Sequence, residues 1–163
     1  MTSVQGDPLL ASFIEVMAGV CAPVAVVTTA LNGMPHGATV SAFASLSLHP
    51  PMVMIALDRA SRLVSRVAAA GRFGVNVLAS DQSGIAKAFG MRGGRRFDHV
   101  RWQFDQGLPR LSATPGWLVC EVSQLVDGGD HIVVFGAVTA GVARPRPPLT
   151  YYRRSFGTHT AIP

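Results

Sequence analysis

The stretch ATVSAFASLSLHPP, residues 38–51, alternates apolar side chains with small hydroxyl side chains along most of its length. From Val40 to Leu48 the even positions are apolar, and the odd positions carry hydroxyls except for Phe43. Successive side chains of a β-strand point to opposite faces, so this period of two predicts a single strand with one apolar face for the core. The other face suits either a barrel wall packed on another subunit or a platform for a ligand.

Strand-like segments joined by short turns flank this stretch. Residues 23–30 (PVAVVTTA) predict a buried strand, and a turn at residues 31–37 around Asn32-Gly33 makes a hairpin with residues 38–51. Residues 51–57 (PMVMIAL) are too continuously apolar for a strand with a solvated face. Further strands are expected at residues 73–79, 117–128 and 131–143, the last two joined by a turn at residues 128–130.

Three short helices are expected among these strands. Asp or Ser at a helix start and Gly after its end satisfy backbone groups that the helix leaves unpaired. The expected helices are residues 8–20 with Asp7 as N-cap, residues 61–70 capped by Ser61 or Asp58 and closed by Gly71, and residues 83–90 capped by Asp81. Residues 91–111 and the tail from residue 144 are expected to be irregular.

The joints between most strands are too short for the crossover helices that a parallel sheet requires. The sequence therefore predicts one mainly β domain over residues 1–163, a small closed barrel with short helices inserted between its strands. Hydrophobic residues make up 48% of the chain and charged residues only 14%, which predicts extensive burial, part of it against another subunit.

Neither a membrane segment nor a secretory signal is evident. No apolar run approaches the ~18 residues needed to cross a bilayer. The start MTSVQGDP lacks a basic segment followed by an apolar one. The expected location is therefore the cytoplasm, with no membrane partner.

The basic residues are almost all arginine: Lys87 is the single lysine among 14 basic residues, and the net charge is +5. Arginine binds phosphate through two parallel hydrogen bonds, so this excess indicates affinity for anions, although a GC-rich coding sequence produces it too. The chain has no long basic run or basic helical stripe, and nucleic acid is therefore not an expected partner.

Groups that serve acid–base, nucleophilic or metal chemistry are scarce. Glu15 and Glu121 are the only glutamates, the five histidines are scattered, and no metal-binding, GxSxG, P-loop or GxGxxG motif is present, so no metal is expected. Cys21 and Cys120 lie among apolar neighbours and are expected to be buried, reduced thiols. This scarcity favours an enzyme whose cofactor performs the chemistry, such as hydride transfer between a nicotinamide and a flavin.

A flavin needs a surface of small residues for its ring, hydrogen-bonding partners for the ring edge and a site for its phosphate. The hydroxyl-bearing strand offers the first two. The turn DRASR at residues 58–62 and the loop at residues 87–97 could provide the third, because Ser61 opens a helix whose N-terminus suits an anion.

The residues resemble the short-chain flavin reductase family, the reductase components of two-component flavin-dependent monooxygenases. The resemblance runs from Pro23 to Gly157 and rests on pieces that occur in the order of the family. These are PVAVVTT, GATVSAFASLSLHPPMVMIALDR followed by ASR, FGVNVLA, IAKAFG with a later Arg96-Phe97, the triplet Gly129-Asp130-His131, and PLTYYRRSFG. The tail departs from many relatives, which have a glycine and a tyrosine where this chain has Arg154 and Phe156.

The resemblance implies an antiparallel split β-barrel of the FMN-binding type, mainly β with short helices, that forms a homodimer. It further implies an enzyme that reduces FMN or FAD with NADH or NADPH and supplies free reduced flavin to a partner monooxygenase. The alternative is a carrier or sensor on the same barrel, which holds flavin without reducing it.

The resemblance also implies roles for individual residues. The flavin ring would lie along Thr39, Val40, Ser41, Ala42, Ser45 and Leu46. Its ribityl and phosphate part would face Asp58, Ser61 and Arg62, with Phe89 and Arg96 as further cofactor-binding positions and Tyr152 approaching across the dimer interface.

Three further positions are interpreted individually. His131 is either a turn histidine bonded to Asp130 or a backbone carbonyl, or the catalytic contact, a neutral partner of the flavin or nicotinamide. The cluster Arg92, Arg95 and Arg96 is either a phosphate site or a solvated loop. Phe43 is expected at a subunit contact.

Overall fold

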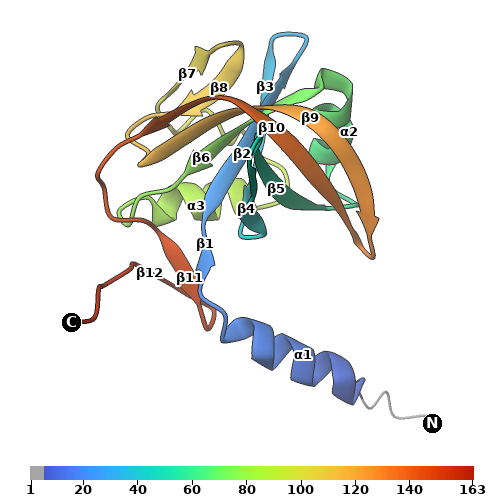
Figure 1. The fold of residues 1–163 in the computed structure, drawn as a ribbon, viewed down its shortest axis with the longest axis vertical. Helices are drawn as coiled ribbons and strands as arrows, with labels where there is room; N and C mark the ends of the chain where they lie inside the picture. The colour runs from blue at the N-terminus through green and yellow to red at the C-terminus, as the bar shows by residue number, and fades with distance from the viewer. Residues whose placement is uncertain (1–5) are drawn as a thin grey trace.

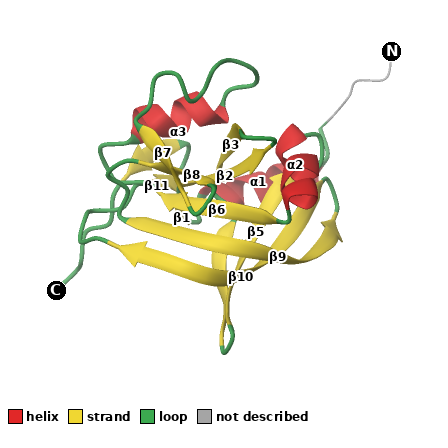
Figure 2. Cartoon of the chain, turned by 90° about the horizontal axis from the view of Figure 1, so that it is seen from above, coloured by secondary structure: helices red, strands yellow, loops and turns green. Residues whose placement is uncertain are grey.

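A computed structural model describes residues 6–163, which form a strongly curved sheet with short helices on its outside (Figures 1 and 2). The helices are α1 (Pro8–Ala18), α2 (Arg62–Ala70) and α3 (Ser83–Gly90). The strands are β1 (Ala22–Pro23), β2 (Ala25–Leu31), β3 (Met34–Val40), β4 (Phe43–Leu48), β5 (Pro51–Asp58), β6 (Arg72–Val77), β7 (Trp102–Asp105), β8 (Leu108–Leu111), β9 (Gly116–Gly128), β10 (His131–Ala143), β11 (Thr150–Tyr152) and β12 (Ser155–Gly157).

Seven strands form the main sheet, in the order β3-β2-β6-β9-β10-β5-β4, and each neighbouring pair is antiparallel. The two edge strands, β3 and β4, are consecutive in the chain, with only Ser41 and Ala42 between them. In a flat sheet, six spacings of about 4.8 Å would separate these edges by ~29 Å. Three Cα–Cα steps reach at most ~11 Å, so the sheet must curl until its edges meet. The predicted small antiparallel barrel is confirmed.

The opening stretch is two strands rather than the single strand that its period of two predicts. β3 ends at Val40, and β4 begins at Phe43 on the opposite edge of the sheet. A register shift between Ser45 and Ser47 interrupts β4 a second time. Period two describes side-chain direction only within an unbroken strand, and here the alternation of the sequence continues across both breaks.

The faces of this stretch also differ from the expected ones. Val40 is buried, but Leu46 and Leu48 on the predicted core face are 41% and 75% exposed. Phe43, expected at a subunit contact, packs against the core of its own barrel. The chain crosses from one sheet edge to the other at residues 41–42, and this crossing changes which positions point inward.

β2 is buried on both of its faces, which explains its mostly apolar sequence, and its two buried threonines, Thr28 and Thr29, donate hydrogen bonds to backbone carbonyls. Its odd residues face the barrel core, and its even residues face a second cluster covered by α3 and the β7–β8 hairpin. The first cluster includes Ala25, Val27, Val40, Val53, Ile55, Leu57, Phe73, Val75 and Val134. The second includes Val24, Val26, Leu78, Ala86, Phe89, Leu111 and Leu149.

The helix caps are mostly those predicted. Asp7 accepts a hydrogen bond from the Leu9 backbone N–H at 2.9 Å, and Ser61 accepts one from Leu63 at 3.2 Å. Gly71 ends α2 in the left-handed conformation, with φ of 67°. The prediction for α3 is wrong, because Gln82 holds the N-cap position there. Asp81 forms an ion pair with Arg146 instead, at 2.8 Å.

Two segments expected to be irregular contain hairpins. β7 pairs with β8 inside residues 91–111, and β11 pairs with β12 in the tail. Tertiary bonds hold the first hairpin in place: the Thr28 hydroxyl donates to Pro109 O at 2.7 Å, and Leu111 N–H donates to the Asn76 side chain at 2.8 Å. Neighbouring strands, rather than local periodicity, therefore stabilise this short hairpin.

Only one of the two cysteines is buried as expected. Cys120 lies in the barrel core, and burial raises the pKa of its thiol to about 12. Cys21 is exposed, which contradicts the prediction. It lies in the connection between α1 and β1, where the apolar neighbours that suggested burial are themselves largely exposed.

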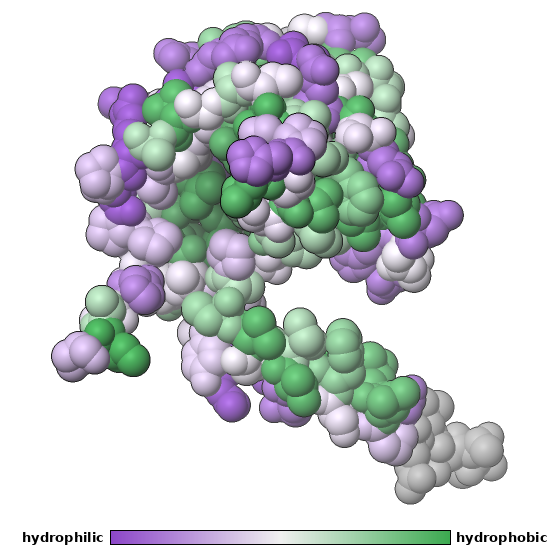
Figure 3. Space-filling model, in the orientation of Figure 1, coloured by the Kyte–Doolittle hydropathy of each residue, from purple (hydrophilic) through white to green (hydrophobic). Residues whose placement is uncertain are grey.

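α1 projects away from the barrel, and no residue of this helix is buried (Figures 1 and 3). Its exposed apolar side chains include Leu9, Leu10, Phe13, Ile14, Val16 and Met17. The β11–β12 hairpin contacts its end, where Arg153 N–H donates to Ala18 O at 2.8 Å. Among residues 6–163, no helix is both long and apolar enough to span a bilayer.

Gly136 tests how tightly the barrel core is packed. A Cβ at this position would lie 2.4 Å from Phe73 Cζ and 3.0 Å from Cys120 Cβ, and both neighbours are fully buried. Gly136→Ala is therefore expected to lower the free energy of unfolding by about 1–3 kcal/mol, the cost of overpacking.

Gly84→Ala is the matched control, because a Cβ there meets nothing within 4 Å and the residue lies inside α3. It should leave the stability unchanged or raise it by about 0.5–1 kcal/mol through helix propensity. Urea denaturation of both variants measures the difference. Equal effects would contradict the described core packing.

Candidate functional site

A small cavity of about 210 Å³ lies where β3 ends. The segments around it are the step between β3 and β4, the end of β5, the start of α2 and the start of β10. Its lining residues are Ala38, Thr39, Val40, Ser41, Ala42, Ala56, Leu57, Asp58, Ser61 and His131. We refer to it as the small cavity.

Backbone pairing fixes the geometry of this cavity. Ala56 N–H donates to Ala42 O at 2.9 Å, which ties the step between the two edge strands to β5. His131 pairs with Asp58 in the register of β10 and β5, so the two side chains begin from neighbouring positions at the rim. Asp58 in turn accepts a hydrogen bond from Ala60 N–H at 2.8 Å and holds the turn that leads into α2.

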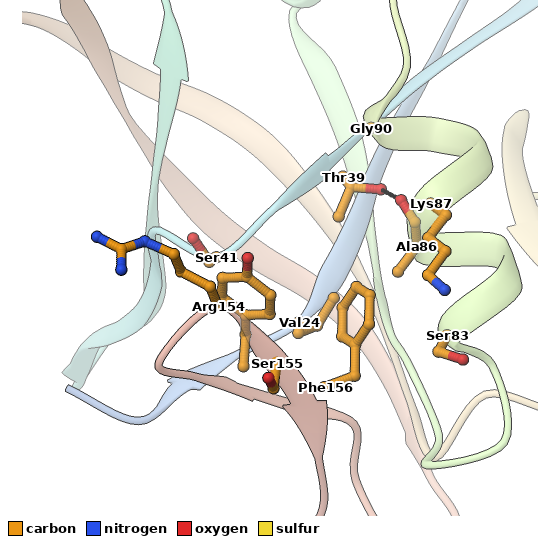
Figure 4. A pocket seen from close by; sticks show the side chains of 11 residues that line it. Val24, Thr39, Ser41, Ser83, Ala86, Lys87, Gly90, Arg154, Ser155 and Phe156 are labelled. Atoms are coloured by element: carbon orange, nitrogen blue, oxygen red, sulfur yellow. Dashed lines mark hydrogen bonds between the residues drawn. The ribbon is translucent and has the colours of Figure 1, made fainter. Parts of the chain in front are cut away.

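A second, larger cavity of about 760 Å³ shares part of its lining with the small one, and Figure 4 shows the side chains around the large cavity. Thr39 and Ser41 line both cavities. The large cavity lies between β3, α3 and the β11–β12 hairpin. Its other lining residues are Val24, Ser83, Ala86, Lys87, Gly90, Tyr151, Arg154, Ser155 and Phe156.

The hydroxyl side chains of the predicted ligand face differ in role: Thr39 bonds to the protein itself, whereas Ser41 faces the cavities. The Thr39 hydroxyl donates to Ala86 O at 2.7 Å and so fastens β3 to α3 at the boundary of the two cavities. Ser41 is exposed and lines both cavities, so its hydroxyl is positioned to meet a ligand. Ser45 and Leu46 lie further along β4, exposed, and line neither cavity.

The position of His131 is compatible with both interpretations of this residue, a turn histidine bonded to Asp130 and a ligand contact. Its Nδ1 lies 2.7 Å from Asp130 Oδ1, as expected of a turn histidine. The ring is still 43% exposed and lines the small cavity. The hydrogen bond and the nearby imidazole hold the pKa of the Asp130 carboxyl below its usual value. Because Nδ1 is engaged, Nε2 is the ring nitrogen that can meet a ligand.

Phe89 and Arg96 have structural roles here and line neither cavity. Phe89 is 1% exposed, and its ring packs edge-on against Phe97 with the centroids 5.0 Å apart. The Arg96 guanidinium donates to Gly37 O at 2.6 Å and to Met91 O. Together they tie α3 and the loop after it to β3, the strand that forms the wall of the site.

The structure places the remaining predicted residues at or beyond the rims. Arg62 is the exposed first residue of α2, and Tyr152 is exposed with its hydroxyl accepting from Arg153 Nε at 3.1 Å. Neither lines a cavity. Of the arginine cluster, Arg92 and Arg95 are exposed and line neither cavity.

Lys87 and Arg154 are the important lining residues that sequence reasoning did not assign. Lys87 is the single lysine, and Arg154 departs from the pattern of many relatives, so both were visible signals. Lys87 and Arg154 line the same cavity because of the β11–β12 hairpin, and no periodic pattern in the sequence predicts this hairpin.

The lining of the small cavity fits a planar aromatic ring. Its alanines leave a surface without bulky side chains, the Ser41 hydroxyl can hydrogen-bond a ring edge, and His131 stands at the rim. Its volume alone falls below the ~300–1,000 Å³ typical of ligand pockets, but the adjoining large cavity extends it. Residues 6–163 contain no cluster of three or more potential metal ligands. This arrangement can hold and orient ligands, with Asp58 and His131 as the titratable groups that line the small cavity.

Comparison with known proteins agrees with this geometry. Residues 17–160 match the family described as flavin reductase like domain. The reductase subunit HsaB of a flavin-dependent monooxygenase from Mycobacterium tuberculosis is 36% identical over 165 residues, which cover 98% of this chain and 85% of the relative. A flavin reductase (NADH) from Kitasatospora aureofaciens is 37% identical over 159 residues, which cover 94% of this chain and 81% of the relative.

A solved structure with the same fold extends the comparison. The Streptomyces globisporus NADH:FAD oxidoreductase SgcE6, in complex with NAD and FAD fragments, is 28% identical and superposes with a TM-score of 0.89. The superposition covers 94% of this chain and 95% of that one. Since the sequence match extends over most of the chain and the split-barrel fold agrees, this chain belongs to the flavin reductase family.

Proposed function

We propose that the chain is an NADH-dependent flavin reductase that takes FMN or FAD as the acceptor. One observation carries the proposal: a small cavity lined largely by small side chains shares Thr39 and Ser41 with a larger cavity that has two cations in its lining. A hydride transfer between two small molecules needs both of them bound side by side, and adjoining cavities provide such an arrangement.

The residues of the step between β3 and β4 would hold the flavin ring. Ala42 and Ala56 provide flat contact surface, and the Ser41 hydroxyl reaches a ring edge. His131 stands at the rim as the proposed catalytic contact, and Ser61 marks the N-terminal end of α2 for ribityl or phosphate groups. When bound, flavin supplies the hydride acceptor. The protein orients the ring and excludes water from its covered face.

The proposed recipient of the reduced flavin is a monooxygenase. The Mycobacterium tuberculosis relative is named as a reductase subunit of such an enzyme, which supports the same role here. The cytoplasmic location expected from the sequence remains a prediction.

Anaerobic mixing of the purified protein with flavin and a nicotinamide tests the function. NADH is expected to bleach the visible absorbance of FMN or FAD at a catalytic concentration of protein, and parallel reactions with NADPH measure the preference between donors. Tight flavin binding without bleaching by either nicotinamide would support the carrier or sensor instead.

His131→Ala tests the proposed catalytic contact. Loss of one hydrogen bond to the reacting pair is expected to slow anaerobic hydride transfer about tenfold, while the flavin Kd changes less than about twofold. His99→Ala, an exposed histidine outside both cavities, is the control and should retain the parent rate. An unchanged rate in His131→Ala would remove this residue from the mechanism.

We further propose that two copies form a homodimer that covers α1. The helix exposes a contiguous apolar surface, and Leu46 and Leu48 expose another on β4, an edge strand of the sheet. Apolar patches of this extent are typical of protein interfaces. A second copy is the occupant that the family resemblance implies.

Phe13→Glu tests this interface. Phe13 is 58% exposed in the single chain, so a charge there costs little in the monomer but disrupts an apolar contact between copies. Analytical ultracentrifugation is expected to show a dimer for the parent chain and weakened association for Phe13→Glu. Ser12→Glu, an adjacent exposed position of α1, should remain dimeric. A monomeric parent chain would contradict the proposal.

A further inference from the structure

Charge is segregated between the two cavities. The small cavity contains the carboxylate of Asp58 and no Lys or Arg in its lining. The large cavity contains Lys87 and Arg154 and no Asp or Glu in its lining. A diphosphate is attracted more strongly to the second environment than to the first, where the Asp58 carboxylate offsets the attraction of the N-terminal end of α2 at Ser61. The large cavity therefore favours the more strongly anionic part of a ligand.

The other residues of the large cavity suit a nucleotide. Tyr151 and Phe156 supply aromatic surface for a base, and Ser83 and Ser155 supply hydroxyls for sugar or phosphate oxygens. The volume of about 760 Å³ is more than three times that of the small cavity.

We propose that Arg154, together with Lys87, recognises the diphosphate of an adenine dinucleotide in the large cavity. This inference rests on the proposed function, because it takes the small cavity as the site of the flavin ring. FAD and NAD(P)H both contain a diphosphate joined to adenosine, whereas FMN ends at one phosphate. Arg154 is thus a specificity-determining residue, which distinguishes dinucleotide from mononucleotide ligands.

The two cations approach the cavity from different elements. Lys87 lies on α3, with Nζ 6.0 Å from the centroid of the Phe156 ring. Arg154 lies in the turn of the β11–β12 hairpin, where its backbone adopts a φ of 62°. Figure 4 shows them on opposite sides of the cavity, with Val24 and Phe156 between them. The Arg154 guanidinium is directed away from Val24 and Phe156 in this view, where it meets Glu15, so it has to turn toward the cavity to contact a ligand there.

Glu15 competes for Arg154. The Arg154 Nη2 lies 3.1 Å from Glu15 Oε1 on α1, and the side chains are 65% and 64% exposed. Exposed ion pairs of this kind are weak and give way to a better partner. A diphosphate offers more negative charge and more acceptor oxygens than one carboxylate, so it can displace Glu15 from the guanidinium.

This competition predicts opposite effects for the two partners. Arg154→Gln should weaken binding of the diphosphate-containing ligand about tenfold, the loss of one charge-assisted contact. Glu15→Gln should strengthen it by about two- to threefold, because the competing carboxylate is gone. Lys87→Gln should weaken the same ligand, and Arg154→Lys should recover part of the affinity.

Calorimetric titrations of FAD, FMN and ADP-ribose into each variant test the proposal. A selective loss of FAD affinity in Arg154→Gln, with FMN changed less than about twofold, assigns the diphosphate to the flavin. A selective loss of ADP-ribose affinity in Arg154→Gln assigns the bound diphosphate to the nicotinamide dinucleotide. Arg153→Gln is the control, because Arg153 lies in the same turn with a positive φ and does not line the cavity.

Equal weakening of FMN, FAD and ADP-ribose, or no weakening of any, would overturn the inference. A lower affinity of Glu15→Gln for the diphosphate-containing ligand would also overturn the inference. A different result contradicts the proposed function: the parent chain does not reduce flavin with either nicotinamide. The ADP-ribose titration needs no flavin, so it still tests the role of Arg154 in that case. Thermal melting of each variant verifies that the fold is retained.

Discussion

The two-residue step at Ser41 and Ala42 is the constraint on which the rest of the structure depends. It joins the two edges of one antiparallel sheet, and so short a connection permits only a closed, barrel-like arrangement. The same step leaves a hollow where β3 has ended and β4 has not begun. The fold and the proposed flavin site therefore have the same structural cause. The small side chains here keep the hollow open, since a larger residue at Ala42 would fill the surface that a planar ligand needs.

Long elements with strong local signals could be predicted from the sequence. The strands of residues 117–128 and 131–143, their glycine-containing turn and the capped helix of residues 61–70 agree with the structure within a residue or two. Elements that depend on tertiary contacts could not. The β11–β12 hairpin turns at Arg153 and Arg154, non-glycine residues with positive φ, so it lacks the glycine that marks most such turns. Alternation alone could not reveal the break at residues 41–42, because a sequence period contains no information about partner strands.

The candidate site was predictable only in part, for a related reason. Resemblance to a family places residues in equivalent positions but does not say what each side chain touches. Seven predicted positions line the small cavity: Thr39, Val40, Ser41, Ala42, Asp58, Ser61 and His131. Phe89 and Arg96 belong to the same sequence pieces, yet their side chains fasten α3 and its following loop to the wall of the site. The large cavity could not be predicted without the structure, because its two cations, Lys87 and Arg154, are 67 residues apart in the sequence (154 − 87).

The most direct test of this account locates the flavin ring itself. In backbone amide NMR spectra of the protein titrated with FMN, the largest chemical-shift changes are expected at Ser41, Ala42 and Ala56, the residues that surround the step between β3 and β4. The core of β9 should remain unperturbed. Changes confined to the large cavity, or no saturable change at the step between the edge strands, would contradict the assignment of this hollow as the flavin site.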